Sequence, residues 1–198
     1  MSYLLKIIAA MGLILLIPII ILALILVFIE DGYPMIFSQS RLGKDKILFN
    51  IYKIRTMKKN TPNKGTHHIS KDHYLFFGAF FRKTKIDELP QIINYLSGHI
   101  NLVGPRPGLE NQKQLTYARE KNNIFNIKPG ITGISQVLGY DMSNPKKLAE
   151  IDKIYLNKKS LKLNLIIFIS TFLKPLRVKL YENLKSEINY VEEKYKNV

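Results

Sequence analysis

The longest apolar run of the chain lies near its amino terminus, where no charged side chain occurs from Ile7 to Ile29. This run is longer than the roughly 18–20 residues that an α-helix needs to cross the hydrocarbon core of a bilayer. A cleaved signal peptide fits poorly, because the run is too long and no small-residue cleavage site precedes Glu30-Asp31. The pattern therefore predicts a membrane-anchoring helix over residues 1–30.

Pro18 lies near the middle of this run and is expected to bend the helix, because proline lacks a backbone donor. Two topologies are compatible with the pattern: a tilted span, or a helix that bends and returns to the side from which it entered. Composition by itself favours the span, because hydropathy cannot detect re-entry. In both cases the positive-inside bias predicts that the basic remainder of the chain stays in the cytoplasm.

The remaining chain changes repeatedly between strand-like and helix-like patterns, which predicts a small, mostly helical α+β catalytic domain over residues 31–180. Residues 35–57 are hairpin-like, since apolar side chains alternate around a turn at residues 42–46. The polar segment Asn60–Asp72 is typical of a surface loop. Helices are expected at Gln91–Leu96, ending at Gly98, and at Gln112–Asn122.

Two apolar patterns mark the carboxyl-terminal part. Residues 146–172 predict one or two helices, and the flanking lysines would suit an amphipathic helix in the lipid headgroup zone. An ordinary core helix explains that segment equally well. Residues 181–198 form a charged tail with a narrow apolar stripe, which indicates docking of a helix or its pairing in a homodimer. The stripe consists of Tyr181, Leu184, Ile188, Val191 and Tyr195.

The charge balance points to anionic partners. The 198 residues include 30 Lys and Arg against 15 Asp and Glu, which favours a nucleotide, a lipid phosphate, a phospholipid surface or a nucleic acid. A nucleic-acid binder would need a known module or basic residues interleaved with exposed aromatics, and neither is evident, so we expect none. The chain has no cysteine, which excludes disulfides and thiolate zinc sites and fits a reducing cytosol.

The candidate chemistry is concentrated between Arg82 and Pro107. Two adjacent carboxylates, Asp87 and Glu88, follow a cationic run, and Arg106 stands between two prolines. Reactions at a phosphate ester need such a set, because cations neutralise the phosphoryl oxygens while acids supply a nucleophile and a Mg²⁺ ligand. The sequence therefore indicates an enzyme that acts on phosphate.

Each candidate also has a structural explanation. Asp87 could cap a helix whose first turn contains Glu88 and Pro90. Lys53 and Arg55 would share one face of a strand, and on composition a solvated basic face is the better interpretation of that pair. A cluster of histidines on the predicted polar loop could suggest a metal site. We expect none there, because the residues lack the helical or hairpin spacing that would bring the ligands together. That cluster is His67, His68, Asp72 and His73.

Five ordered motifs resemble those of the bacterial sugar transferases, the monotopic polyprenyl-phosphate phosphoglycosyl transferases. The chain looks like the short members of that family, such as the diacetylbacillosamine 1-phosphate transferases of protein glycosylation. The resemblance extends from the anchor to about Phe172. The motifs are Arg41–Lys44, Phe49–Met57, Arg82–Gln91, Leu102–Pro107 and Lys128–Gly133.

The resemblance implies transfer of a sugar 1-phosphate from a UDP-sugar to undecaprenyl phosphate, with Mg²⁺ and release of UMP, at the cytoplasmic face of the bacterial inner membrane. Asp87 would be the nucleophile that forms a phosphosugar intermediate, and Glu88 the metal ligand. The implied phosphate-binding residues are Lys53, Arg55, Arg82 and Arg106. Membrane phospholipids would be further partners, and a non-catalytic scaffold of a glycan-assembly complex is the alternative.

The resemblance also implies a re-entrant anchor that bends at a Ser-Pro pair. Here the pair is Ile17-Pro18, so the serine hydroxyl that could satisfy freed backbone groups is missing. Three other departures lie outside the acid pair. His99 replaces an acid of the family pattern, Asn126 stands where an Arg-His pair is common, and Asn164 stands where aspartate is common. With the resemblance included, re-entry becomes the favoured topology.

Overall fold

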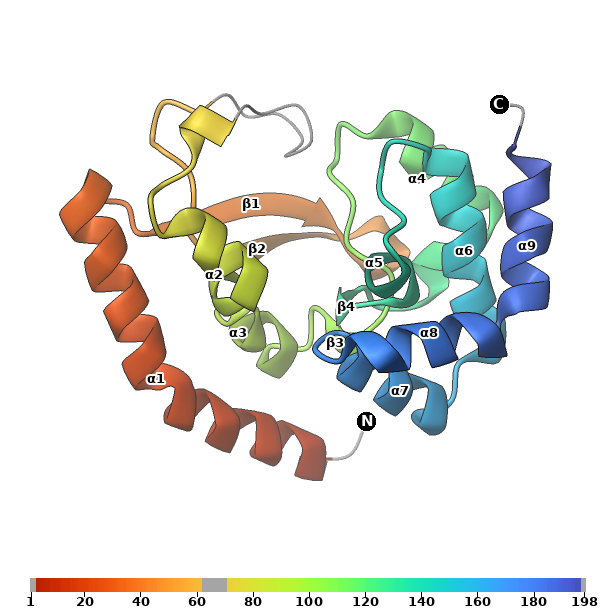
Figure 1. The fold of residues 1–198 in the computed structure, drawn as a ribbon, viewed down its shortest axis with the longest axis horizontal. Helices are drawn as coiled ribbons and strands as arrows, with labels where there is room; N and C mark the ends of the chain where they lie inside the picture. Colours follow the sequence, from red (N-terminus) through yellow and green to blue (C-terminus); the bar gives the residue numbers. More distant parts are fainter. Residues whose placement is uncertain (1–2, 62–70, 197–198) are drawn as a thin grey trace. The chain divides into compact units, whose positions relative to one another are not determined.

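The computed structural model describes residues 3–61 and 71–196, and its contacts divide the chain into two compact units. The first unit comprises residues 1–39 and 50–97, and the second comprises residues 40–49 and 98–198. Helices predominate and the strands are short, so the predicted mostly helical α+β class is confirmed (Figure 1).

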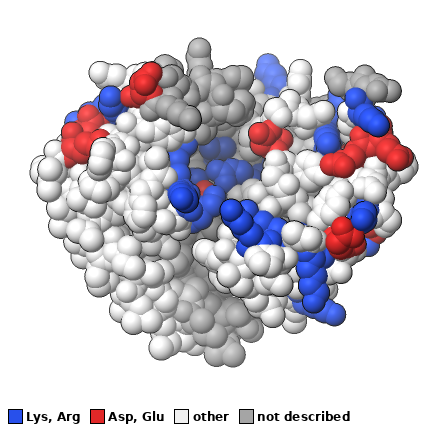
Figure 2. Space-filling view, in the orientation of Figure 1, with Lys and Arg blue, Asp and Glu red and all other residues white. Residues whose placement is uncertain are grey.

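Helix α1 (Tyr3–Asp31) contains the whole apolar run. Within the described residues, its segment Ala9–Asp31 is the one helix long and apolar enough to cross a membrane. Pro18 lies inside α1, and the helix bends part-way along its length, as a missing N–H and a ring clash require (Figure 1). Figure 2 shows a surface over α1 that is almost free of charged side chains until the end nearest β1.

The predicted hairpin is confirmed as β1 (Ile36–Leu42) and β2 (Leu48–Ile54), which pair in a two-stranded sheet around the 3₁₀ turn Lys44–Lys46. Phe49 and Ile51 are buried while Leu48 and Asn50 are exposed, which is the alternation that the sequence predicted for this strand. A second 3₁₀ turn spans Lys71–His73.

The rest of the first unit consists of short helices: α2 (Gly78–Thr84), the 3₁₀ turn η4 (Ile86–Glu88) and α3 (Gln91–Leu96). Its core joins Ala23 and Val27 of α1 to Ile54, Leu75 and Phe81. Each of these five side chains is no more than 3% exposed. The carboxyl-terminal half of α1 is therefore a core helix of this unit as well as part of a candidate anchor.

The second unit is organised around two short parallel strands, β3 (Asn101–Val103) and β4 (Gly130–Thr132). Asn101 pairs with Gly130 and Val103 with Thr132. The backbones approach so closely that a Cβ on Gly130 would lie 2.1 Å from the amide nitrogen of Gly104. Two of the sequence motifs therefore meet here, and glycine is required because any side chain would collide with backbone.

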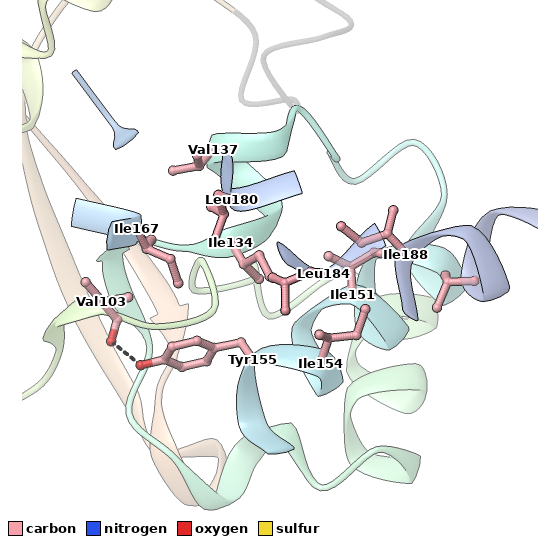
Figure 3. Close-up of a cluster of buried hydrophobic side chains, with 11 residues drawn as sticks. Val103, Ile134, Val137, Ile151, Ile154, Tyr155, Ile167, Leu180, Leu184 and Ile188 are labelled. Atoms are coloured by element: carbon pink, nitrogen blue, oxygen red, sulfur yellow. Dashed lines mark hydrogen bonds between the residues drawn. The ribbon is translucent and has the colours of Figure 1, made fainter. Parts of the chain in front are cut away.

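Helices surround these strands and enclose the larger core. Figure 3 shows Ile151 and Tyr155 packed among side chains from the neighbouring helices, with the Tyr155 hydroxyl donating to the carbonyl of Val103 at 3.1 Å. Asn164 gives that hydroxyl a second acceptor at 2.9 Å. The helices are α4 (Lys113–Lys121), α5 (Ile134–Leu138), α6 (Pro145–Lys158), α7 (Leu161–Ser170), α8 (Lys174–Asn183) and α9 (Lys185–Lys194), with a 3₁₀ turn at Ile124–Asn126.

The apolar segment 146–172 forms two helices, α6 and α7, whose first turns are capped by the Asn144 and Ser160 side chains. Ile167 of α7 is fully buried, whereas Leu165 and Phe168 on the same helix remain 59% and 40% exposed. The core interpretation of α7 is thus correct for one side. A headgroup position for its exposed side stays a prediction.

The predicted tail, residues 181–198, contains the end of α8 and the whole of α9, which are separated at Leu184. Leu184, Ile188 and Val191 are buried in the same core as Ile151, so the predicted stripe docks within the second unit. This docking accounts for the stripe without a second copy of the chain. The division into parts 1–30, 31–180 and 181–198 stays a prediction.

Candidate functional site

The acid pair lies on a tight reversal between α2 and α3. Lys85, with a left-handed φ of +64°, ends α2 and begins η4, the turn that carries Asp87 and Glu88. Both acids are buried, at 5% and 9% exposure. The helix-capping explanation of Asp87 is wrong, because α3 begins after Pro90 without any side-chain cap.

Glu88 is held by a lysine from the sheet. The Lys53 Nζ lies 2.6 Å from the Glu88 Oε1, and both side chains are largely buried. Lys85 is a weaker second partner, with its Nζ 3.9 Å from Oε2. Strand β2 thus brings a cation from 35 positions away onto the acid pair.

Arg82 is held by two hydroxyl groups of the same unit. Its Nε donates to the Thr56 Oγ1 and its Nη1 to the Tyr74 hydroxyl, both at 2.9 Å, and the guanidinium lies 4.9 Å from the centre of the Tyr74 ring. Gly78 permits this arrangement, because a Cβ there would lie 2.2 Å from the Thr56 carbonyl oxygen. The arginine is thereby positioned before any ligand binds.

Asp87 differs from its neighbours in lacking a partner for one buried oxygen. Among the described residues, no group donates a hydrogen bond to its Oδ1. Burial raises the pKa of the Asp87 carboxyl, the positive charges of Lys53, Arg82 and Lys85 act to lower it, and Glu88 adds to the rise. A desolvated carboxylate oxygen surrounded by cations is suited to attack an electrophile or to bind a cation.

Arg55, which directly follows β2, has a different role from Lys53, which lies within that strand. Its guanidinium pairs with the Asp31 carboxylate at 2.8 Å and donates to the carbonyls of Asp31 and Gly32 at 3.2 and 2.8 Å. The residue is only 7% exposed. The interpretation of Lys53 and Arg55 as a solvated basic face is therefore wrong, and Arg55 ties β2 to the end of α1.

Arg106 belongs to the second unit, where a second arginine lies near it. Arg41 donates to the Pro107 carbonyl at 3.2 Å, and burial together with the charge of Arg106 lowers the pKa of Arg41 to about 10. The structure therefore brings Lys53, Arg82, Asp87 and Glu88 together in one unit and places Arg106 with Arg41 in the other.

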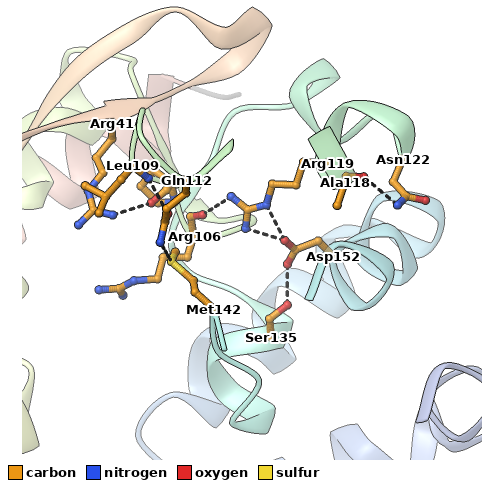
Figure 4. A network of polar contacts seen from close by, with 11 residues as sticks. Arg41, Arg106, Leu109, Gln112, Ala118, Arg119, Asn122, Ser135, Met142 and Asp152 are labelled. Atoms are coloured by element: carbon orange, nitrogen blue, oxygen red, sulfur yellow. Dashed lines mark hydrogen bonds and ion pairs between the residues drawn. The ribbon is translucent and has the colours of Figure 1, made fainter. Parts of the chain in front are cut away.

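The sequence reasoning missed a buried network behind Arg106. The Arg119 Nη1 donates to the Arg106 carbonyl at 2.7 Å, and the same guanidinium binds Asp152 Oδ2 through Nε at 3.1 Å and Nη2 at 2.6 Å (Figure 4). Ser135 donates to the other oxygen of Asp152 at 2.5 Å.

A signal for this network was present in the sequence. Asp152 falls on the apolar stripe of α6, four residues after Leu148 and three before Tyr155. A charged residue on a buried helix face needs a partner, so its position alone called for a search for a basic residue elsewhere in the chain.

The described residues contain no group of three or more His, Asp or Glu side chains that could hold a metal ion. His67 and His68 of the histidine cluster lie outside the described residues. The acid pair nevertheless fits Mg²⁺, which is commonly held by one or two carboxylates together with substrate phosphates. The unpartnered Asp87 oxygen and the neighbouring Glu88 carboxylate provide such a donor set.

Comparison with known proteins identifies the family. A model described as bacterial sugar transferase matches residues 3–178. The chain belongs to the bacterial sugar transferase family. The resemblance drawn from the five motifs is therefore confirmed, and the acid pair, Arg82 and Arg106 all lie within the matched region.

Several bacterial sugar transferases resemble the chain over most of its length. The uncharacterized sugar transferase EpsL of Bacillus subtilis is 36% identical over 80% of this chain and 78% of its own. The UDP-glucose:undecaprenyl-phosphate glucose-1-phosphate transferase of Xanthomonas campestris is 32% identical over 86% of this chain and 37% of its own. A UDP-N-acetylgalactosamine-undecaprenyl-phosphate N-acetylgalactosaminephosphotransferase of Aeromonas hydrophila is 32% identical, over 78% and 38%. The chain thus spans little more than a third of these two larger relatives.

Proposed function

We propose that this protein transfers a sugar 1-phosphate from a UDP-sugar to undecaprenyl phosphate and releases UMP. The observation that carries the proposal is the buried, unpartnered oxygen of Asp87 among Lys53, Arg82 and Lys85. Relatives named for UDP-glucose and UDP-N-acetylgalactosamine support both the donor class and the acceptor. An assay with a panel of UDP-sugars would identify the sugar that this chain accepts.

In the proposed reaction, an oxygen of the Asp87 carboxylate attacks the phosphorus that bears the sugar. The bond from that phosphorus to the bridging oxygen breaks, and the electron pair leaves with UMP. An oxygen of undecaprenyl phosphate then attacks the same phosphorus and displaces the carboxylate, which yields a polyprenyl diphosphate sugar. Covalent capture divides the transfer into two steps, so the soluble donor and the lipid acceptor need not bind together.

The neighbouring side chains have separate roles in this proposal. Lys53 holds Glu88, and its positive charge opposes the rise that burial causes in the pKa of Asp87, which favours the ionised form of the nucleophile. Arg82 is held by Thr56 and Tyr74, so its guanidinium is preorganised to bind phosphoryl oxygens as negative charge develops. Glu88, with Asp87, would hold Mg²⁺, which supplies further neutralisation of the phosphate charge. In the second unit, Arg106 is the proposed partner of a substrate phosphate.

The covalent step is tested by mass spectrometry. The wild-type protein incubated with a UDP-sugar alone should gain a phosphosugar adduct on Asp87 and release one equivalent of UMP. Asp87→Asn should abolish both the adduct and turnover. Asp45→Asn is the matched control, because Asp45 is exposed and has a left-handed φ that asparagine tolerates. Substantial turnover by a folded Asp87→Asn protein would remove Asp87 from this role.

The metal is tested separately. EDTA should silence the enzyme, added Mg²⁺ should restore it, and Glu88→Gln should raise the Mg²⁺ concentration needed for half-maximal rate or prevent turnover. An EDTA-treated protein that keeps its full rate contradicts a role for Mg²⁺.

We also propose that α1 enters the cytoplasmic membrane and returns to the cytoplasmic side, which leaves the catalytic part in the cytoplasm. The bend of α1 and the Lys and Arg excess of the remaining chain support this topology. Single cysteines at Ser2 and Lys196 can test it, because the native chain has none. An impermeant maleimide should label neither position in intact cells, and should reach position 2 only after Pro18→Leu. Labelling at position 2 without that substitution would establish a full span.

A further inference from the structure

An apolar cavity of about 390 Å³ lies between α1 and α2 in the first unit. Leu22 and Leu26 of α1 line one side of the cavity. The other side is lined by Phe77, Phe80 and Phe81, together with Ile86, the first residue of η4. The described residues that line the cavity are all apolar. The cavity is open to the outside, since Leu22 and Phe80 remain 57% and 53% exposed.

The elements that line this cavity also carry the charged cluster. Ile86 immediately precedes Asp87 in η4, and Phe81 immediately precedes Arg82 in α2. A ligand that fills the cavity and extends past Ile86 therefore needs an apolar body and an anionic end. A polar nucleotide or sugar would lose its hydration in the cavity without gaining any hydrogen bond.

We propose that this cavity receives the isoprene units nearest the phosphate of the acceptor lipid, so that the lipid phosphate is delivered beside Asp87. This inference rests on the proposed function, which it deepens by assigning the acceptor a binding site. Exposed apolar side chains of α1, among them Leu15 and Ile14, precede the cavity residues along the helix, so the more distant isoprene units can extend along α1 into the bilayer. Burial of apolar surface in the cavity provides the affinity, and the cations provide the selectivity for a phosphate head.

A substitution that fills the cavity tests the assignment by kinetics. Leu22→Trp should raise the KM for undecaprenyl phosphate at least tenfold while leaving the KM for the UDP-sugar and the amount of Asp87 adduct unchanged. Leu15→Trp is the matched control, because Leu15 is 78% exposed on the same helix and does not line the cavity. An active Leu22→Trp protein with wild-type KM values would overturn the inference and leave the proposed function intact.

Crosslinking tests the same site without relying on turnover. A polyprenyl phosphate with a photoactivatable group in its first isoprene units should label peptides that contain Leu22 or Phe80, and excess undecaprenyl phosphate should prevent the labelling. Labelling confined to other peptides contradicts the inference, and so does equal protection by phosphatidylglycerol, which would indicate a site for bilayer lipid in general. If the wild type labels as expected but releases no UMP from any UDP-sugar, the proposed function fails and the lipid site stands.

Discussion

Two buried aspartates, one in each unit, are treated in opposite ways by their surroundings. Asp152 is fully buried, and both of its oxygens are satisfied, one by Arg119 and the other by Ser135. Asp87 is nearly as buried, yet its Oδ1 has no hydrogen-bond partner among the described residues. A buried aspartate thus has all its hydrogen bonds in the second unit, whereas in the first unit one of its oxygens still lacks a partner.

The difference separates stability from function in physical terms. Removing a carboxylate from water costs free energy, which the guanidinium and hydroxyl of the second unit offset with directed hydrogen bonds. In the first unit burial raises the pKa of Asp87, and the nearby cations offset that rise only in part. A buried polar atom without a partner is uncommon in folded proteins, so its presence beside fixed cations indicates a place for a ligand.

The largest effect on stability is expected from breaking the satisfied aspartate. Asp152→Asn leaves the buried Arg119 guanidinium without a counter-charge, which should lower the free energy of unfolding by about 3–5 kcal/mol. Thermal unfolding in detergent should show a Tm lower by roughly 10 °C for a chain of this size. Glu193→Gln on the exposed side of α9 is the control and should change little. An equal loss in both variants would deny the network a special role.

A change in the pH profile should follow from altering the cation beside Asp87. Attack needs the ionised carboxylate, so the rate should rise with pH as Asp87 deprotonates, with a midpoint above the ordinary range for aspartate of about 3.9. Lys53 lowers the pKa of Asp87, so Lys53→Gln should move that midpoint to higher pH. The pH dependence of kcat/KM for the UDP-sugar measures this shift.

Lys83→Gln is the matched control for that experiment, because Lys83 is exposed at the end of α2 and has no part in the pKa shift of Asp87. A midpoint that stays in place or falls in Lys53→Gln would show that a group other than Asp87 governs the acid limb.

A smaller loss is expected when Arg82 loses one of its two hydroxyl partners. Thr56→Val removes the acceptor of the Arg82 Nε and should cost about 1 kcal/mol, which corresponds to roughly a fivefold fall in kcat/KM if the guanidinium binds the reacting phosphate. Thr61→Val is the control, since the Thr61 hydroxyl donates only to a local carbonyl on the surface. Equal rates in both variants would mean that Tyr74 alone positions Arg82.

The smallest change in stability is expected for Asp87→Asn, which should not destabilise the protein as Asp152→Asn does. Folding raises the pKa of Asp87, so the stability cost of its ionised carboxylate begins above the ordinary pKa of aspartate and is complete above the folded-state pKa. Asp87→Asn should therefore keep or slightly raise the Tm at neutral pH while it abolishes transfer. A fall in Tm comparable with that of Asp152→Asn would erase the contrast between the two residues.

Local patterns in the sequence predicted most of the helices and both strands of the hairpin. The apolar run, the β2 alternation and the Gln91–Leu96 helix with its glycine stop all rest on neighbouring residues, and all are present. The adjacency of Asp87 and Glu88 in the chain likewise made the acid pair visible without a structure.

Contacts between distant residues could not be read in the same way. Lys53 and Arg55 have the same charge and are two positions apart, yet one binds Glu88 and the other binds the end of α1. Arg119 of α4 pairs with Asp152 of α6, and the two residues are 33 positions apart in the chain. Such pairs depend on how the elements pack, which no pattern within a single segment records.

The clamp between Arg55 and the end of α1 has a practical consequence for producing the protein. Removing residues 1–30 is a common way to seek a water-soluble enzyme. The shortened chain would lose Ala23 and Val27, and this loss would expose Ile54, Leu75 and Phe81. Arg55 binds the carbonyls of Asp31 and Gly32, and without α1 these groups would no longer be held in place by a helix. Removal of the helix therefore uncovers the interior beside Lys53, and solubility is better sought with detergent or nanodiscs than by truncation.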